Sequence, residues 1–221
     1  MVKSKTNAGS GIPEAKQVRS KATIQQVLDI TSAVLAEYGE GRVRVQEISA
    51  QTGVSIGSIY HHFGNREGLI VAAYVDSYAK GMRQDLEILR SMLDGITDIQ
   101  QLTTSTDPLR SLINAHFSEH SAMARIAILG AAGGRTRLKE ALTREQTCLL
   151  ESFTQSIQRL IDIKIFKQNI SAHAVAVVLL GIVLGRAVSE VDSVPLQPEE
   201  WNQVLMEMLW GLLNPELLAA S

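Results

Sequence analysis

A four-residue segment, TGVS at residues 52–55, constrains the fold more than any other part of this chain. It separates two segments with helical character, residues 45–52 and residues 56–62, each only about two turns long. Gly53 allows the backbone to reverse tightly, and Ser55 is a suitable N-cap for the second helix. Two helices this short and this close form a helix-turn-helix unit, which needs a longer helix to pack against.

The side chains of this unit divide into an inner set and an outer set. Ile48, Val54 and Ile59 are predicted to point inward, toward the helix that precedes the unit. The outer face of the second helix then carries small and polar residues, and such a face suits a helix that lies in the major groove of DNA. This outer set consists of Ile56, Gly57, Ser58, His61 and His62.

The rest of the chain has the periodicity of helices, and no run of residues has the period of two that a strand requires. The sequence therefore predicts an all-α fold. The first helix is expected to begin near Ser20 and to end at Gly39. Further helices are predicted at residues 65–93, 107–120, 122–129, 136–163, from 169 or 171 to 188, and 198–213.

We expect three regions along the chain. Residues 1–19 lack periodicity and form a basic flexible tail, residues 20–66 form a three-helix DNA-binding domain, and residues 67–221 form a helical domain for ligand binding and dimerisation. Charge follows this division, because residues 1–66 contain eight Lys and Arg against five Asp and Glu, a net charge of +3, while the remainder has a net charge of -5. A basic end on an acidic body indicates a polyanionic partner at that end.

The N-terminal part of the sequence resembles the DNA-binding end of TetR-family transcriptional regulators. The resemblance rests on a first helix that ends in AEYGE, followed by VQEISAQTGVSIGSIYHHFGNREGLI, and it covers roughly residues 20–75. Within it, Gly53-Val54-Ser55, Tyr60, His62-Phe63 and Arg66 fall at the family's spacing. The remaining two thirds of the chain agree with the family only in being helical and of suitable length.

The resemblance implies roles for individual residues. Tyr60 would contact a DNA phosphate through its hydroxyl, and Arg66 would grip the DNA backbone at the start of the long helix. Arg44 stands where the family often has a capping Thr, and it would supply another phosphate-binding cation. Ile24 stands where a basic residue is common. The residues that would face base edges or sugars are Ser55, Ile56, Gly57, Ser58 and His61.

Histidine and cysteine side chains raise the question of metal or redox chemistry. His61 and His62 are adjacent, so on a helix they diverge by about 100° and cannot easily bind one ion. His62 is interpreted as a packed or phosphate-facing residue. His116 and His120 have helical i, i+4 spacing, but no third ligand is fixed beside them, so they are interpreted as surface or pocket-lining residues. The single cysteine, Cys148, is expected to be a buried or half-buried structural thiol.

The long helix from Asn65 is predicted to connect DNA binding to ligand binding. Its C-terminal half is apolar on one face, which indicates that it lines a pocket for a hydrophobic or aromatic small molecule. The predicted lining residues are Tyr78, Met82, Leu86, Leu89, His116, Phe117, His120, Met123 and Phe153.

The last two predicted helices are apolar over more of their surface than a single core would cover. Pairing them with a second copy as a four-helix bundle would bury that surface, and the resemblance implies the same arrangement. One core within a monomer is the alternative. The residues expected at the dimer interface are Val177, Val178, Gly181, Leu184, Gly185, Trp201, Leu205, Met208, Leu209 and Leu212.

The sequence thus predicts a homodimeric regulator of transcription, most simply a repressor, which binds a palindromic DNA operator and is released by a small effector. No convergent set of nucleophile, acid and base is present, so no enzyme activity, catalytic residue, cofactor or metal site is expected. The chain has no secretory signal, and its longest apolar run is short for a membrane span, so we expect a cytoplasmic protein. An activator of the same fold, or a helical interaction protein that does not bind DNA, is the alternative.

Overall fold

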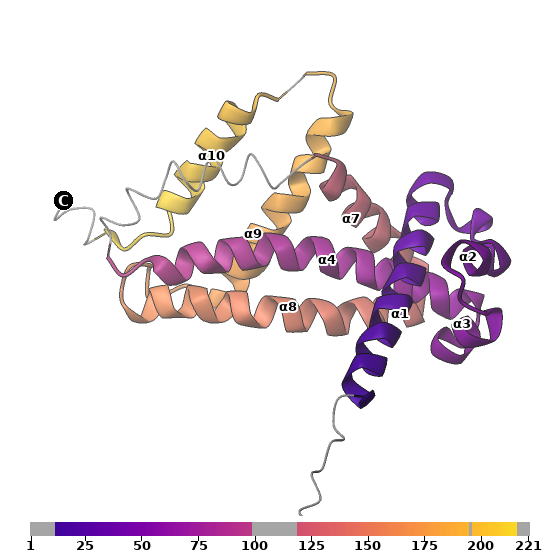
Figure 1. Cartoon of the computed structure of the whole chain (residues 1–221). Coiled ribbons are helices and arrows are strands. Elements are labelled where there is room, and N and C mark those ends of the chain that lie inside the picture. Colours follow the sequence, from indigo (N-terminus) through magenta and orange to yellow (C-terminus); the bar gives the residue numbers. More distant parts are fainter. Residues whose placement is uncertain (1–11, 99–118, 195, 216–221) are drawn as a thin grey trace, which may run out of the picture. The chain divides into compact units, whose positions relative to one another are not determined.

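The computed structural model describes residues 12–98, 119–194 and 196–215, and within these ranges every named element is a helix and none is a strand. The predicted all-α fold is confirmed. The chain divides into two compact units, Met1–Ser77 and Tyr78–Ser221. Figure 1 shows the order of the helices along the chain.

The first unit holds α1 (Ile12–Tyr38), the 3-10 turn η1 (Glu40–Arg42), α2 (Val45–Thr52), α3 (Ile56–Phe63) and the start of α4 (Arg66–Gly95). The prediction that a helix begins near Ser20 is wrong, because α1 already starts at Ile12. Pro13 then lies in the first turn of α1, where a missing N–H costs nothing. Residues 12–19, expected to belong to a flexible tail, are therefore helical, and residues 1–11 lie outside the described range.

The core of the first unit is built by apolar side chains from each of its helices. Ile48 of α2, Val54 of the turn and Ile59 of α3 are all buried, as the sequence predicted, and Phe63 is half-buried against them. Because α2 and α3 supply so few core residues of their own, the unit depends on α1 and α4 for the rest. Those residues are Val27, Leu28, Leu35, Leu69, Ile70 and Ala73.

The turn between α2 and α3 has the backbone that its sequence predicts. Gly53 ends α2 in the left-handed conformation with φ 71°, and its N–H donates to the Ser49 carbonyl at 2.9 Å. A side chain at this φ would be strained, which explains the glycine. Ser55 then caps α3, since its Oγ accepts a hydrogen bond from the Ser58 N–H at 3.1 Å. Asn65 caps α4 in the same way, through the Gly68 N–H at 2.8 Å.

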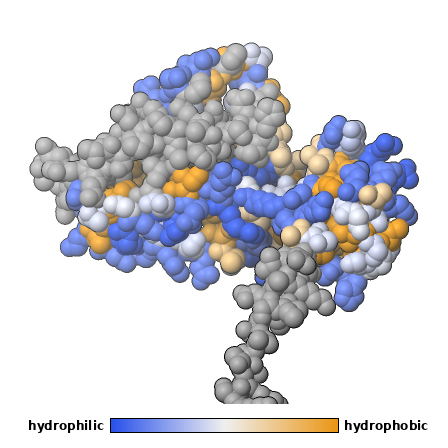
Figure 2. Space-filling model, in the orientation of Figure 1, coloured by the Kyte–Doolittle hydropathy of each residue, from blue (hydrophilic) through white to orange (hydrophobic). Residues whose placement is uncertain are grey.

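The second unit contains the rest of α4, then α7 (Glu119–Ala131), α8 (Thr136–Asp162), α9 (Ala172–Gly185) and α10 (Pro198–Trp210), with 3-10 turns η2 (Ala132–Gly134) and η3 (Arg186–Val191). Within it, α4 and α8 run side by side, and the faces seen in Figure 2 are mainly hydrophilic. The helix predicted at residues 107–120 lies outside the described range except for its last two residues.

Two polar contacts fix the ends of the helices in the second unit. Arg159 of α8 donates to the carbonyls of Leu93 and Ile96, and the Ile96 contact measures 3.0 Å. This arginine therefore binds carbonyls at and just beyond the C-terminal end of α4, where the helix itself supplies no N–H donors. Near the same end of α8, Phe166 and Leu213 form an isolated antiparallel bridge that joins the segment after α8 to the segment after α10.

The apolar run in α9 continues into η3. Ala172–Ser189 is, among the described residues, the one stretch that is long and apolar enough to cross a membrane by length and composition, a test that core helices also pass. The α-helical part has 14 residues, so it measures about 21 Å at 1.5 Å per residue. A hydrocarbon core is about 30 Å thick, and the helical part is too short to cross it without tilt or thinning.

Candidate functional site

The α3 helix presents an outer face that the core of its unit leaves open. Ile59 is fully buried, whereas Ile56 and Tyr60 are 36% and 39% exposed. His61 and His62 are exposed, and Ser58 is half-buried. The predicted outer residues thus lie together on one short helix, and with Tyr60 they offer one aliphatic group, two imidazoles and a phenol to the solvent.

Gly57 is the most informative residue of this face. It lies in the first turn of α3, and a Cβ added at this position would meet no heavy atom within 4 Å. Its backbone φ is also outside the left-handed region that favours glycine. Glycine costs up to about 1 kcal/mol in a helix relative to alanine. Nothing within the described part of the chain requires a glycine here, and the backbone of α3 is open to the solvent at this residue.

The two adjacent histidines do not converge on a common point. Their ring centroids are 5.5 Å apart and their planes are inclined at 74°. No group of three His, Cys, Asp or Glu side chains in the described ranges is arranged to hold a metal ion. The pair is therefore an exposed polar surface at the end of α3, and its edge-to-face contact gives the rings a defined orientation.

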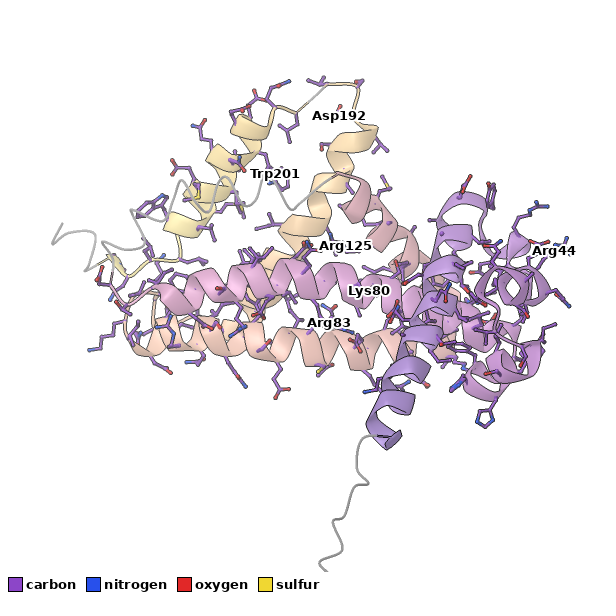
Figure 3. All side chains as sticks on the ribbon, in the orientation of Figure 1. Arg44, Lys80, Arg83, Arg125, Asp192 and Trp201 are labelled. Carbon is purple, nitrogen blue, oxygen red and sulfur yellow. The ribbon has the colours of Figure 1, made fainter. Side chains whose placement is uncertain are left out.

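Arg44 projects away from the first unit, as Figure 3 shows. Its side chain is 60% exposed, and its Nε lies 3.5 Å from the carboxylate of Glu47, one helical turn along α2. An exposed pair of this kind contributes about 0–1 kcal/mol, so it leaves the guanidinium able to exchange partners. Arg44 also forms the non-helical N-cap of α2 without a side-chain cap bond.

Arg66 is exposed and has hydrogen-bond partners within the protein. Its Nε donates to the Val43 carbonyl at 2.8 Å, and its Nη2 donates to the Glu40 carbonyl. The side chain therefore binds the protein's own backbone just before α2. The sequence indicates the cation but not its partners, because a residue type does not specify which carbonyl groups lie within reach.

In the second unit, four of the predicted pocket residues are buried. Tyr78, Met82, Leu86 and Phe153 are buried, while Leu89 and Met123 are half-buried. His116 and Phe117 lie outside the described residues, as does the side chain of His120.

A buried polar cluster that was not predicted from the sequence joins α4 to α7 and α8. Asp85 accepts a hydrogen bond from Arg125 Nη1 at 2.5 Å, and both side chains are over nine-tenths buried. The same nitrogen lies 3.4 Å from the sulfur of Met82. Tyr78 donates to Gln146 at 2.5 Å, and burial raises the pKa of its phenol, although Arg125 lowers it by a smaller amount. Arg125 is labelled among the second unit's helices in Figure 3.

Two hollows in the second unit lie away from these core residues. An open one of about 610 Å³ lies at the start of α8, beside Arg135, Lys139 and Arg144. An apolar one of about 290 Å³ lies between α9 and α10. None of the predicted pocket residues lines either hollow. The apolar hollow is lined by Ile170, Ser171, Ala174, Val175, Val178, Leu179, Ile182, Met208, Leu209 and Leu212.

Apolar side chains on α9 and α10 remain in contact with solvent. Val177, Val178 and Met208 are 45%, 55% and 49% exposed. Gly181 is exposed as well, and Leu205 is buried behind them against Leu89 and Ile182. The remaining residues predicted at a dimer interface are half-buried: Leu184, Gly185, Trp201, Leu209 and Leu212.

Cys148 is exposed on α8. The prediction that its thiol is at least half-buried is therefore wrong. The buried positions of α8 include Leu142, Leu150 and Phe153, and Cys148 falls on the opposite, hydrophilic side of the helix.

The comparisons with known proteins agree with this arrangement. Residues 27–73 match the family model for "Bacterial regulatory proteins, tetR family". The fatty acid metabolism regulator protein of Bacillus subtilis is 31% identical over 103 residues, which are 47% of this chain and 47% of that protein. The HTH-type transcriptional repressor KstR2 of Rhodococcus jostii is 33% identical over 86 residues, 37% of this chain and 40% of the repressor. The matches thus span less than half of each relative.

Solved structures extend the likeness of fold to most of the chain. A TetR transcription regulator from Haloarcula marismortui has a TM-score of 0.61 at 17% identity, covering 87% of this chain and 99% of the other. The fatty acid degradation regulator FadR of Bacillus halodurans has a TM-score of 0.56 at 20% identity, covering 83% and 94%. Residues 27–73 therefore form a TetR-family domain, and the likeness to solved structures extends the all-α fold to most of the chain.

Proposed function

We propose that this chain is a homodimeric repressor that binds a palindromic DNA operator and is released by a small hydrophobic effector. The observation that carries the proposal is the open face of α3, where a Cβ added at Gly57 would have no heavy atom within 4 Å. A backbone exposed in this way can approach base edges closely. A cytoplasmic location follows from a function on chromosomal DNA.

Contacts to DNA would divide into two groups. Arg44, Tyr60 and the basic residues before α1 would contact phosphates, which fix position and supply a salt-dependent part of the affinity. Ile56 could contact a thymine methyl group, while Ser58 and His61 would face base edges. The Ser55 hydroxyl already accepts the Ser58 N–H, so its first role is to cap α3, and any contact with DNA would be made in addition.

Dimerisation would use α9 and α10. The exposed side chains of Val177, Val178 and Met208, together with the apolar hollow between the two helices, support an apolar interface with a second copy. Two copies related by a dyad would present two α3 helices to half-sites about one turn of DNA apart. A homodimer would therefore read a palindrome.

Effector control would pass along α4. This helix begins at Asn65's cap in the first unit and carries Tyr78, Met82 and Leu86 in the second. An effector that binds better to a conformation with wrongly spaced α3 helices would release DNA by linkage. One relative and one solved structure are named for fatty acid metabolism and fatty acid degradation, which supports an effector with an aliphatic chain.

Substitution of Gly57 tests the DNA-binding face directly. Gly57→Ala is expected to raise the free energy of unfolding by up to about 1 kcal/mol, because alanine favours a helix. The same methyl group would hold bases away from α3 and weaken specific DNA binding about tenfold, the equivalent of about 1.4 kcal/mol. Thermal unfolding and a mobility-shift titration with the chain's own upstream DNA would measure the two effects.

Gly41→Ala is the matched control for this experiment. Gly41 also has no heavy atom within 4 Å of an added Cβ, but it lies in η1, outside α3. We expect this variant to bind DNA like the wild type. Equal affinities for the wild type and Gly57→Ala would contradict the proposed placement of α3 against the bases.

A further inference from the structure

Asp85 of α4 and Arg125 of α7 are the only charged side chains that are buried among the residues the structure describes. Arg125 Nη1 lies 2.5 Å from the Asp85 carboxylate and 3.4 Å from the sulfur of Met82. Removing two charges from water offsets much of their mutual attraction, and apolar side chains of similar volume are often as stable in the same place. The pair is therefore poorly explained as a source of stability alone.

The guanidinium of Arg125 lies along a single turn of α4. Besides Met82 and Asp85 it approaches Gly81, where an added Cβ would lie 3.8 Å from Arg125 Nε. Residues 81, 82 and 85 lie on one side of the helix, because residues three and four apart are neighbours on a helical surface. These contacts place Arg125 at one height along α4.

A shift of α4 along α7 would separate the two charges. One helical turn measures about 5.4 Å, which is further than a hydrogen bond can reach. Each group would then be buried away from its opposite charge, a strongly unfavourable arrangement. Apolar contacts have no such direction, so Met82 and Leu86 could exchange one set of neighbours for another. The ion pair therefore penalises a shifted α4 far more than the apolar side chains around it do.

We infer that the Asp85–Arg125 pair is a positioning device, which fixes the height of α4 on α7, and that operator binding depends on this height. The inference rests on the proposed function, in which two α3 helices must match the spacing of two half-sites. Because α4 is one helix from Arg66 to Gly95, a displacement of its second half along its axis also displaces its first turn. That turn supplies Leu69 and Ile70 to the core that holds α3.

The decisive variant is the double change Asp85→Leu with Arg125→Met, which replaces the pair by apolar side chains. We expect a melting temperature within about 4 °C of the wild type's, and an intact dimer, because α9 and α10 are unchanged. Specific DNA binding should nevertheless weaken about tenfold, as it would if only about a tenth of the molecules held the competent arrangement. Binding to an unrelated duplex should not change, since no phosphate contact is removed. Thermal unfolding, sedimentation and mobility-shift titration measure these effects.

Arg83→Met with Glu145→Leu is the matched control. These residues also pair α4 with another helix, α8, at 2.7 Å, but the Arg83 side chain is 59% exposed. Arg83 and Arg125 are both labelled in Figure 3. An exposed pair contributes little to either stability or geometry, so its loss should leave specific binding at the wild-type level. Wild-type affinity in the double variant at Asp85 and Arg125 would overturn the inference, and so would an equal loss of affinity in the control.

Asp85→Glu keeps the test decisive if the double variant does not fold. Glutamate retains the charge but moves the carboxylate outward by one methylene group, about 1.5 Å. The pair can then form only if α4 moves relative to Arg125. We expect a folded protein whose specific DNA binding is several-fold weaker than the wild type's, with the same affinity for an unrelated duplex. Specific binding equal to the wild type's would overturn the inference in this case.

Hydrogen exchange tests the positioning role without DNA. If the wild type binds no DNA specifically, the proposed function fails, and the inference is then judged by the backbone amides of α7. In the double variant these amides should exchange about tenfold faster than in the wild type, although the two melting temperatures agree, because α4 and α7 lose their fixed relative position. Equal exchange in the two proteins would show that the pair does not position α4.

Discussion

Replacing Val178 by Asp is expected to convert the protein into a monomer and to lower its affinity for the specific DNA by at least about a thousandfold. Specific binding is typically about 10³–10⁷ times tighter than non-specific binding, and a monomer that reads one half-site would lose much of that difference. Val178 is 55% exposed and lines the apolar hollow with Met208. A carboxylate there would be buried without a partner if a second copy covered it.

Sedimentation and mobility shift would measure this prediction on the same sample. The wild type should sediment with twice the chain mass of 24.1 kDa, and Val178→Asp with that mass itself. Ile163→Asp is the matched control, because Ile163 is also apolar and 44% exposed but follows α8 and lies outside α9 and α10. A Val178→Asp protein that remains dimeric would place the interface elsewhere.

Replacing Asp85 by Ala should destabilise the second unit by about 3–5 kcal/mol, because it leaves the Arg125 guanidinium buried without its carboxylate. Both side chains are over nine-tenths buried, and the pair joins α4 to α7 at 2.5 Å. For a chain of this size, such a loss lowers the melting temperature by about 10 °C. Thermal unfolding followed by circular dichroism would show it.

Two further variants separate the charge from the packing. Glu145→Ala removes the carboxylate of the exposed pair with Arg83, which has an Nη2–Oε1 distance of 2.7 Å, and should cost less than about 1 kcal/mol. The double change Asp85→Leu with Arg125→Met removes both buried charges and should recover most of the stability that Asp85→Ala loses. If Asp85→Ala lowers the free energy of unfolding no more than Glu145→Ala does, burial adds nothing to the stability that the Asp85–Arg125 pair contributes.

Much of the fold could be predicted from the sequence because its signals are local. Gly53 and Ser55 mark the turn between α2 and α3, and the structure has the predicted tight turn and serine cap there, with Gly53 in the left-handed conformation. The start of α1 could not be placed, because Pro13 is compatible with both a tail and a first helical turn.

The contacts of charged side chains could be predicted less well. Arg66 carries a cation at the family's spacing, but its partners are carbonyl groups that only folding brings within reach. Asp85 did carry a signal, since it interrupts the apolar face formed by Tyr78, Met82, Leu86 and Leu89. A charge in such a position predicts a buried partner, but the periodicity of α7 alone does not identify Arg125.

The measurement that most directly tests the account is a mobility-shift titration of the full chain with its own upstream DNA, at two salt concentrations, against a shuffled duplex of equal length and composition. We expect a complex with the upstream DNA at concentrations at least about a thousandfold below those the shuffled duplex needs, and weaker binding to both at high salt. Equal binding to the two duplexes, or no salt-sensitive complex with either, would contradict the assignment of α3 as a helix that reads DNA.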